Sequence, residues 1–275
     1  MQISDFLIKK INNEYNEEIC KKIKNGLVSK KPVTFRINTL KTDKEKVIKE
    51  LKESNIEFEE VKWNNDAIII KNALEEDIRK LKIYENGEIY LQSLSSMIPP
   101  VILEPKEKEN ILDMAAAPGG KTTYIAELME NEGQIDAWDL YETRTKLIKE
   151  NAERLGITII NTKQNDATKY QKENEKKYDK ILLDVPCMGI GVIKRKPDIK
   201  WHREEKDLKI ISKIQKQILE NCSKYLKEKG TIVYSTSFVF LLLIFSILQE
   251  HKQMPTKITV NAKTILHFAI KKAPQ

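Results

Sequence analysis

The chain has 275 residues, enough for one large or two modest domains, and its 40% hydrophobic residues allow a sizeable buried core. The net charge of +7 favours a polyanionic partner, but only weakly, because lysine-rich composition has other origins. Three cysteines and three scattered histidines show no CxxC or metal-ligand spacing, so we predict neither a disulfide framework nor a metal site. The apolar run Phe238–Phe245 is far shorter than the ~20 residues that span a bilayer, and the first residues lack a signal-peptide core. We therefore expect a monomeric protein of the reducing cytoplasm, away from membranes.

The first part of the chain predicts a small α+β domain at residues 1–105. Its expected elements are helices in 3–27, a strand Val33–Asn38, a helix Lys44–Ser54, paired strands Ile56–Val61 and Ala67–Ile70, and a short helix Glu75–Leu81. The composition shifts near residue 105, and we place the domain boundary there.

Residues 106–275 alternate between strand and helix patterns. The expected strands are Asn110–Met114, Gln134–Asp139, Ile157–Asn161, Lys180–Asp184 and Thr231–Ser235, and the helices are Thr122–Glu130, Thr143–Leu155 and Glu204–Leu226. Gly156 is expected to end the second helix in a left-handed conformation. Such alternation is typical of an α/β domain with a doubly wound, mostly parallel sheet. Ligands of these sheets bind at the carboxyl ends of the strands, where we look for functional residues.

A loop of small residues follows the first of these strands and comprises Ala115, Ala116, Ala117, Pro118, Gly119, Gly120 and Lys121. Small side chains let the backbone approach a ligand closely. A phosphate-binding P-loop would need glycine where Ala115 stands, and the dinucleotide pattern Gly-x-Gly-x-x-Gly is absent. The remaining alternative is a loop for an adenosyl ligand without phosphates.

Aspartates follow three strands of this domain. Asp139 ends the second strand, where a carboxylate can accept both ribose hydroxyls, and Asp166 follows the third, near an expected adenine amino group. Asp184 ends the fourth strand. Each aspartate alone is equally consistent with a helix cap, but three in series at one edge of the sheet favour a ligand site.

Cys187 follows the fourth strand and enters a glycine-containing loop at the same edge. A lone cysteine is usually a small core residue, yet this position favours a role in the site. The next segment is basic and contains one tryptophan; its residues of interest are Lys194, Arg195, Lys196, Lys200 and Trp201. It is either a solvated basic loop or a phosphate-contacting patch with an aromatic side chain.

Together these residues make the sequence resemble the Nol1/Nop2/Sun family of RNA cytosine-5 methyltransferases, and most of all the bacterial Sun (RsmB-type) enzymes of small-subunit ribosomal RNA. The resembling segments are Arg36–Lys41, Gln92–Met97, Ala115–Thr122, Asp139, Asp166, Asp184–Cys187 and Arg195–Trp201. The resemblance covers about residues 30–236. It implies a class I methyltransferase fold, an RNA substrate (ribosomal RNA favoured, tRNA an alternative) and S-adenosylmethionine as the methyl donor. The helical RNA-binding domain that leads the longer Sun enzymes is not expected here.

The resemblance also implies roles for residues. Ala115–Lys121, Asp139, Asp166 and Asp184 would contact the cofactor or the target base. Arg36 and Asn38 would contact RNA in the N-terminal domain, as would the basic segment at 194–201. In this chemistry a thiolate adds to carbon 6 of cytosine, and an acidic residue near nitrogen 3, here Asp184, balances the charge. Cys187 would assist product release.

Ser237 stands where the family has its nucleophilic cysteine. A serine hydroxyl is almost never ionised at pH 7, whereas a thiol titrates near pH 8.5. The tail from about residue 237 is also atypical, although Ile265–Lys271 is compatible with a closing strand. Three explanations stay open: a reading frame shifted after 237, a paralogue that binds RNA and cofactor but is catalytically impaired, or Cys187 as the nucleophile. A methyltransferase acting on protein or on small molecules is a further alternative.

Overall fold

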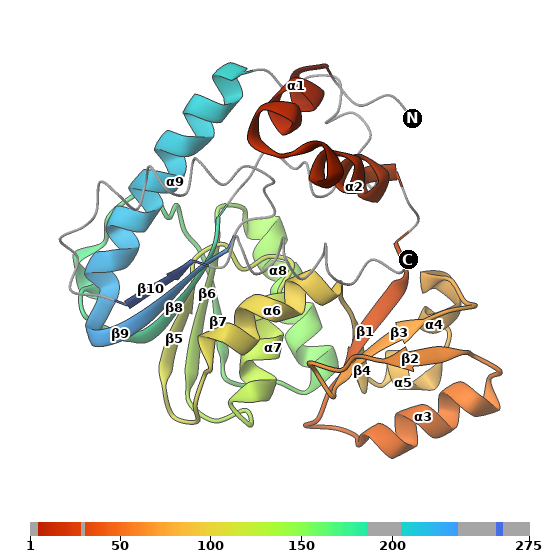
Figure 1. The fold of residues 1–275 in the computed structure, drawn as a ribbon. Coiled ribbons are helices and arrows are strands. Elements are labelled where there is room, and N and C mark those ends of the chain that lie inside the picture. Colours follow the sequence, from red (N-terminus) through yellow and green to blue (C-terminus); the bar gives the residue numbers. More distant parts are fainter. Residues whose placement is uncertain (1–4, 29–30, 186–204, 236–256, 261–275) are drawn as a thin grey trace.

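The computed structural model describes residues 5–28, 31–185, 205–235 and 257–260 (Figure 1). Several residues singled out in the sequence lie outside these ranges: Cys187, Lys194, Arg195, Lys196, Lys200, Trp201, Ser237, Phe238–Phe245 and Ile265–Lys271.

The N-terminal part contains a four-stranded antiparallel sheet with strand order β2-β3-β1-β4. Its elements are α1 (Asp5–Glu14), α2 (Glu17–Val28), β1 (Val33–Ile37), α3 (Lys44–Glu53), β2 (Phe58–Glu60), β3 (Ala67–Ile70), α4 (Glu75–Arg79), α5 (Lys82–Glu85) and β4 (Ile89–Leu91). The Asp43 side chain caps α3 by accepting a hydrogen bond from the backbone N–H of Lys46. The α+β prediction is confirmed, including the pairing of β2 with β3, whereas α5 and β4 were not predicted.

The larger sheet has strand order β10-β9-β8-β5-β6-β7, and every pairing in it is parallel. Its strands are β5 (Asn110–Asp113), β6 (Gln134–Asp139), β7 (Ile160–Gln164), β8 (Tyr178–Asp184), β9 (Leu226–Ser235) and β10 (Lys257–Val260). The predicted doubly wound parallel sheet is confirmed. The third strand begins three residues later than expected, and β9 begins five residues earlier.

Helices cover both faces of this sheet: α6 (Leu94–Leu103), α7 (Gly120–Leu128), α8 (Glu142–Leu155) and α9 (Glu205–Tyr225), with a 3-10 turn η1 (Lys172–Asn174). Figure 1 shows α9 on one side, and α6, α7 and α8 on the other, toward the N-terminal strands. Gly156 ends α8 with φ +75, which confirms the predicted left-handed cap. Among the residues the structure describes, no helix is long and apolar enough to cross a membrane.

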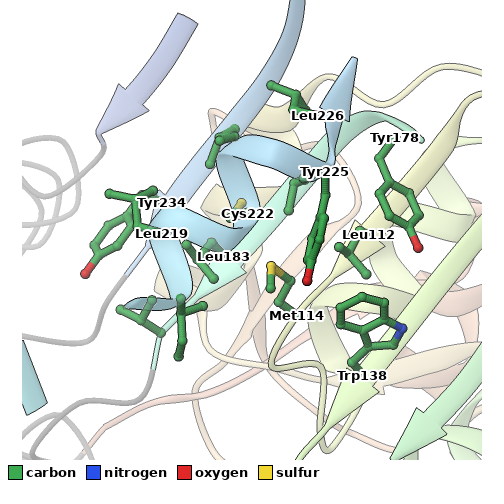
Figure 2. Packing of buried hydrophobic residues seen from close by; sticks show 14 residues of the cluster. Leu112, Met114, Trp138, Tyr178, Leu183, Leu219, Cys222, Tyr225, Leu226 and Tyr234 are labelled. Carbon is green, nitrogen blue, oxygen red and sulfur yellow. The ribbon is translucent and has the colours of Figure 1, made fainter. Parts of the chain in front are cut away.

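Neighbouring residues of one strand build the two cores, because successive side chains of a strand point to opposite faces. Leu112 belongs to the core under α9, which Figure 2 shows with Trp138, Cys222 and Tyr225. Ile111 belongs to the core under α6, α7 and α8. The carboxyl ends of the parallel strands are thus held in register between two packed layers.

The boundary placed at residue 105 stays a prediction. β4 pairs with β1 of the N-terminal sheet, whereas α6, which also precedes residue 105, packs against the larger sheet through Leu103.

Candidate functional site

The small-residue loop joins β5 to α7 and is held closely by its surroundings. The N–H of Ala116 donates to the carbonyl of Trp138 on β6 at 2.8 Å. From α8, Arg144 donates to the carbonyl of Ala117 at 2.9 Å, and Asn151 donates to that of Pro118 at 3.0 Å. These contacts fix the backbone of the loop between β6 and α8.

Gly119, the residue before α7, has φ +100, a conformation that L side chains rarely adopt. A Cβ atom there would also lie 3.2 Å from the Cα of Ile148 on α8. Glycine is therefore required at this position by both the backbone conformation and the close approach of α8.

Lys121, at the start of α7, pairs with Asp184 at the end of β8. The Nζ atom lies 2.6 Å from Oδ2 of Asp184, with 20% and 30% of the two side chains exposed. The hydroxyl of Ser235 on β9 donates to the other carboxylate oxygen at 2.5 Å. The structure therefore brings two predicted site residues together and adds Ser235, which the sequence reasoning did not single out.

Asp113, the last residue of β5, is a further carboxylate that the sequence reasoning missed. It is 1% exposed and accepts a hydrogen bond from the Thr122 hydroxyl at 2.7 Å. Burial raises the pKa of Asp113 to about 7, and the nearby charge of Asp184 also raises it. Its position at the end of a parallel strand, which it shares with Asp139 and Asp184, was the signal that could have found it.

Asp139 ends β6 next to the loop and is 3% exposed. One carboxylate oxygen accepts the N–H of Tyr141 at 3.2 Å, and the other lies 3.3 Å from Arg144. Arg144 also holds the carbonyl of Ala117, so one side chain links Asp139 to the loop.

Asp166 lies two residues beyond β7, and the N–H of the preceding Asn165 donates to the carbonyl of Asp139 at 2.9 Å. Hydrogen bonds from Thr168 to its carboxylate lower the pKa of Asp166, so it is ionised at neutral pH. The three predicted aspartates and Asp113 thus follow the four adjacent strands β8, β5, β6 and β7.

The expectation that Arg36 and Asn38 contact RNA does not hold in this structure, because both side chains are 0% exposed. Arg36 donates to Glu127, Gln92 and Thr123. Asn38 donates to the carbonyls of Gly87 and Leu155. Both residues join the N-terminal sheet to helices of the larger domain.

The charge pattern indicates which ligand the loop can hold. Among the residues that the structure describes, Lys121 is already paired with Asp184 and further carboxylates follow the neighbouring strands, so these groups would repel a phosphate. The same carboxylates suit a cationic ligand that carries ribose hydroxyls. Among the described residues, no group of three or more His, Cys, Asp or Glu side chains could hold a metal ion.

Comparison with known proteins agrees with this fold. A family model described as 16S rRNA methyltransferase RsmB/F matches residues 100–272. The chain belongs to this family. A second model, described as the ferredoxin-like domain of RsmF/B-like methyltransferases, matches residues 3–76.

Two relatives illustrate the range of this similarity. A probable ribosomal RNA small subunit methyltransferase B of Bacillus subtilis is 38% identical over 253 residues, which is 90% of this chain and 56% of that protein. A tRNA (cytosine(49)-C(5))-methyltransferase of Pyrococcus abyssi is 39% identical over 208 residues, covering 75% of this chain and 66% of that protein. The chain spans about half the length of the ribosomal RNA relatives that it matches.

Solved structures show the same architecture. A methyltransferase homologue from Pyrococcus horikoshii superposes with a TM-score of 0.74 at 32% identity, over 90% of this chain and 82% of that one. NSun6 from the same organism, solved with the S-adenosylmethionine analogue SFG, gives a TM-score of 0.77 at 26% identity, over 90% and 87% of the two chains. The predicted class I methyltransferase fold with a smaller N-terminal domain is therefore confirmed.

Proposed function

We propose that the chain binds S-adenosylmethionine at the loop Ala115–Lys121 and transfers its methyl group to carbon 5 of a cytosine in RNA. The observation that carries this proposal is the loop itself. Its lysine, Lys121, is paired with Asp184, and carboxylates follow the neighbouring strands at their carboxyl ends. The likeness to cytosine-C5 methyltransferases of ribosomal RNA and tRNA supports the reaction class.

The described residues fit this cofactor. When bound, S-adenosylmethionine supplies an activated, cationic methyl group. The backbone from Ala115 to Gly120 offers a surface without long side chains, and Asp139 would accept the ribose hydroxyls. Asp166 would lie near the adenine, and the carboxylate of Asp184 would add negative charge near the cationic ligand.

Asp184 is the described residue that we place beside the target base. Lys121 and Ser235 hold its two oxygens, which fixes the carboxylate at the end of β8. In that position it would balance charge at nitrogen 3 of cytosine. The nucleophile that adds to carbon 6 would come from Cys187 or from Ser237, whose hydroxyl would need a strong adjacent base.

For the substrate we propose ribosomal RNA of the small subunit, with tRNA as the second candidate because both classes occur among the relatives. The basic segment Lys194, Arg195, Lys196, Lys200 and Trp201 would contact the RNA backbone and stack on a base. We further propose that the protein works as a monomer in the cytoplasm. Its described cysteines Cys20 and Cys222 are free and buried, which suits a reducing compartment.

Two measurements test these steps separately. Calorimetry with S-adenosylmethionine should show binding to the wild-type chain and its loss in Asp139→Ala. The matched control is Asp136→Ala, on the same strand but paired with Lys177, which should bind like the wild type. A wild-type chain that does not bind would overturn the proposal.

Transfer is measured with labelled methyl donor on small-subunit ribosomal RNA and on tRNA. Activity lost in Cys187→Ala would assign the nucleophile to Cys187. Activity that arises only in Ser237→Cys would show that serine impairs the wild-type chain. If both the wild-type chain and Ser237→Cys bind S-adenosylmethionine but transfer no methyl group, the proposed reaction is contradicted. The chain would then be a cofactor-binding protein.

A further inference from the structure

Two hydrogen bonds connect the N-terminal sheet to the cofactor loop through Thr123. Arg36 on β1 donates from Nη2 to the Thr123 hydroxyl at 2.8 Å. That hydroxyl donates in turn to the carbonyl of Gly119 at 2.8 Å. Arg36 and Thr123 are both 0% exposed, so water does not compete for these bonds.

A second connection reaches the next peptide of the loop. Gln92, just after β4, donates from Nε2 to the carbonyl of Gly120 at 3.2 Å and accepts from Arg36 at 2.7 Å. The Tyr90 ring also packs against Gly120, where a Cβ atom would lie 3.1 Å from its Cε1. The N-terminal domain therefore reaches two consecutive carbonyls, that of Gly120 directly through Gln92 and that of Gly119 through Arg36 and the intervening Thr123.

The orientation of Arg36 is fixed independently of these bonds. Glu127 on α7 accepts from its Nε and Nη2 atoms, both at 2.8 Å. The guanidinium also lies 4.4 Å from the Tyr90 ring centroid and 5.0 Å from that of Tyr124. This fork-shaped pairing docks β1 against α7. The additional bonds end on the carbonyls of Gly119 and Gly120, where the loop enters α7, and the Gly119 carbonyl also accepts the backbone N–H of Thr123 at 2.8 Å.

We propose that Arg36, Gln92 and Thr123 are positioning residues for the cofactor loop, so that the docked N-terminal domain sets the affinity for the cofactor. The inference rests on the proposed function, because it takes the loop to be the S-adenosylmethionine site. Its physical basis is preorganisation: a loop already held in its binding conformation loses less entropy when the ligand binds.

The experiment measures the affinity for S-adenosylmethionine by calorimetry, together with the thermal midpoint, in the full chain. Thr123→Val keeps the side-chain shape and removes the hydroxyl, and we expect it to bind about tenfold more weakly. Thr123→Ser keeps the hydroxyl and should bind within about twofold of the wild type. The matched control is Thr145→Val, in the first turn of α8, whose hydroxyl donates within its own helix to the carbonyl of Glu142.

A purely structural role predicts a different pattern, in which Thr123→Val and Thr145→Val lower the midpoint without changing the affinity. Unchanged affinity in folded Thr123→Val would overturn the inference while leaving the proposed function intact. If Thr123→Val does not fold, Gln92→Glu tests the inference in its place. This variant keeps an acceptor for Arg36 and removes the donor to Gly120. It should bind S-adenosylmethionine at least about fivefold more weakly than the wild type. A wild-type chain that does not bind would overturn both the proposed function and this inference.

Discussion

Lys121 and Asp184 form an ion pair of 2.6 Å that joins the first turn of α7 to the end of β8. The pair links the proposed cofactor loop to the residue that we propose lies beside the target base. Ser235 occupies the other oxygen of the carboxylate, so Asp184 is held from two elements. The pair is partly buried, and its contribution should therefore lie between that of an exposed and that of a fully buried ion pair.

Lys121→Met should lower the free energy of unfolding by about 1–2 kcal/mol, as expected between these two limits. It should lower methyl transfer by about tenfold or more, because Asp184 loses one of the groups that orient it. Urea denaturation and single-turnover transfer measure the two effects. The control is Lys149→Met, whose pair with Glu153 spans 3.9 Å and is mostly exposed. Equal effects of the two substitutions would contradict the assigned role of Lys121.

Arg36→Ala should be among the most destabilising substitutions in the chain, at about 3–5 kcal/mol, because it leaves the buried carboxylate of Glu127 without its cation. Burial already raises the pKa of Glu127, and the Arg36 charge opposes that rise. Denaturation of Arg36→Met, Glu127→Met and the double variant tests the coupling. The double variant should lose less free energy of unfolding than the two single variants lose together. Losses that simply add would argue against a coupled pair.

Local sequence patterns predicted the parallel sheet and the three aspartates at its edge because both follow from short-range rules. Strand–helix alternation sets the fold class, and the carboxyl ends of parallel strands meet at one edge. Gly156 was placed correctly for the same reason, since a glycine after a helical pattern favours a left-handed cap.

Long-range contacts explain what the sequence could not predict. The resemblance implied that Arg36 contacts RNA, and no local pattern indicated its partner Glu127, which lies 91 residues away. The helix α6 was missed because it contains Pro99 and Pro100. Pro100 cannot donate to the carbonyl of Ser96, and the side chain of Gln92 donates to that carbonyl instead, at 3.0 Å.

Asp113 should make stability fall as pH rises. Its folded-state pKa of about 7 lies above its unfolded value, so the folded chain binds the extra proton. The stabilisation is complete below the unfolded pKa and is lost as pH rises through about 7. Asp113→Asn keeps an acceptor for Thr122 and should be more stable than the wild type at pH 8 by about 2–4 kcal/mol, with little difference at low pH.

Urea denaturation from pH 4 to 8 measures this change, with Asp179→Asn as the control of opposite sign. Burial tends to raise the pKa of Asp179, but hydrogen bonds from Asn110 and Lys227 leave it lowered overall. Its stabilisation is therefore present above the unfolded pKa and lost on acidification. If Asp113→Asn has the same dependence of stability on pH as the wild type, Asp113 is already ionised in the folded chain.

Gly87 and Gly156 offer a matched test of how the two domains meet. Both have left-handed φ values, +71 and +75, so an alanine is strained at either position. At Gly87 the new Cβ would lie 2.0 Å from the backbone carbonyl oxygen of Arg154 on α8. At Gly156 it would lie 2.8 Å from the Cε atom of Lys41, a side-chain atom that can shift, although the Nζ of that lysine donates to the carbonyls of Asn86 and Arg154.

Gly156→Ala should therefore cost about 1–2 kcal/mol from backbone strain and about 0.5–1.5 kcal/mol more if Lys41 gives up one of its hydrogen bonds. Gly87→Ala should cost about 1–3 kcal/mol more, because the chain after α5 must move away from α8. That movement would also stretch the hydrogen bond from Asn38 to the Gly87 carbonyl, now 2.8 Å long, and weaken the docking of the N-terminal sheet. Urea denaturation midpoints of the two variants measure the difference in stability. Equal losses of stability would mean that α8 shifts to accept the added methyl group and that the interface between the two domains is not weakened.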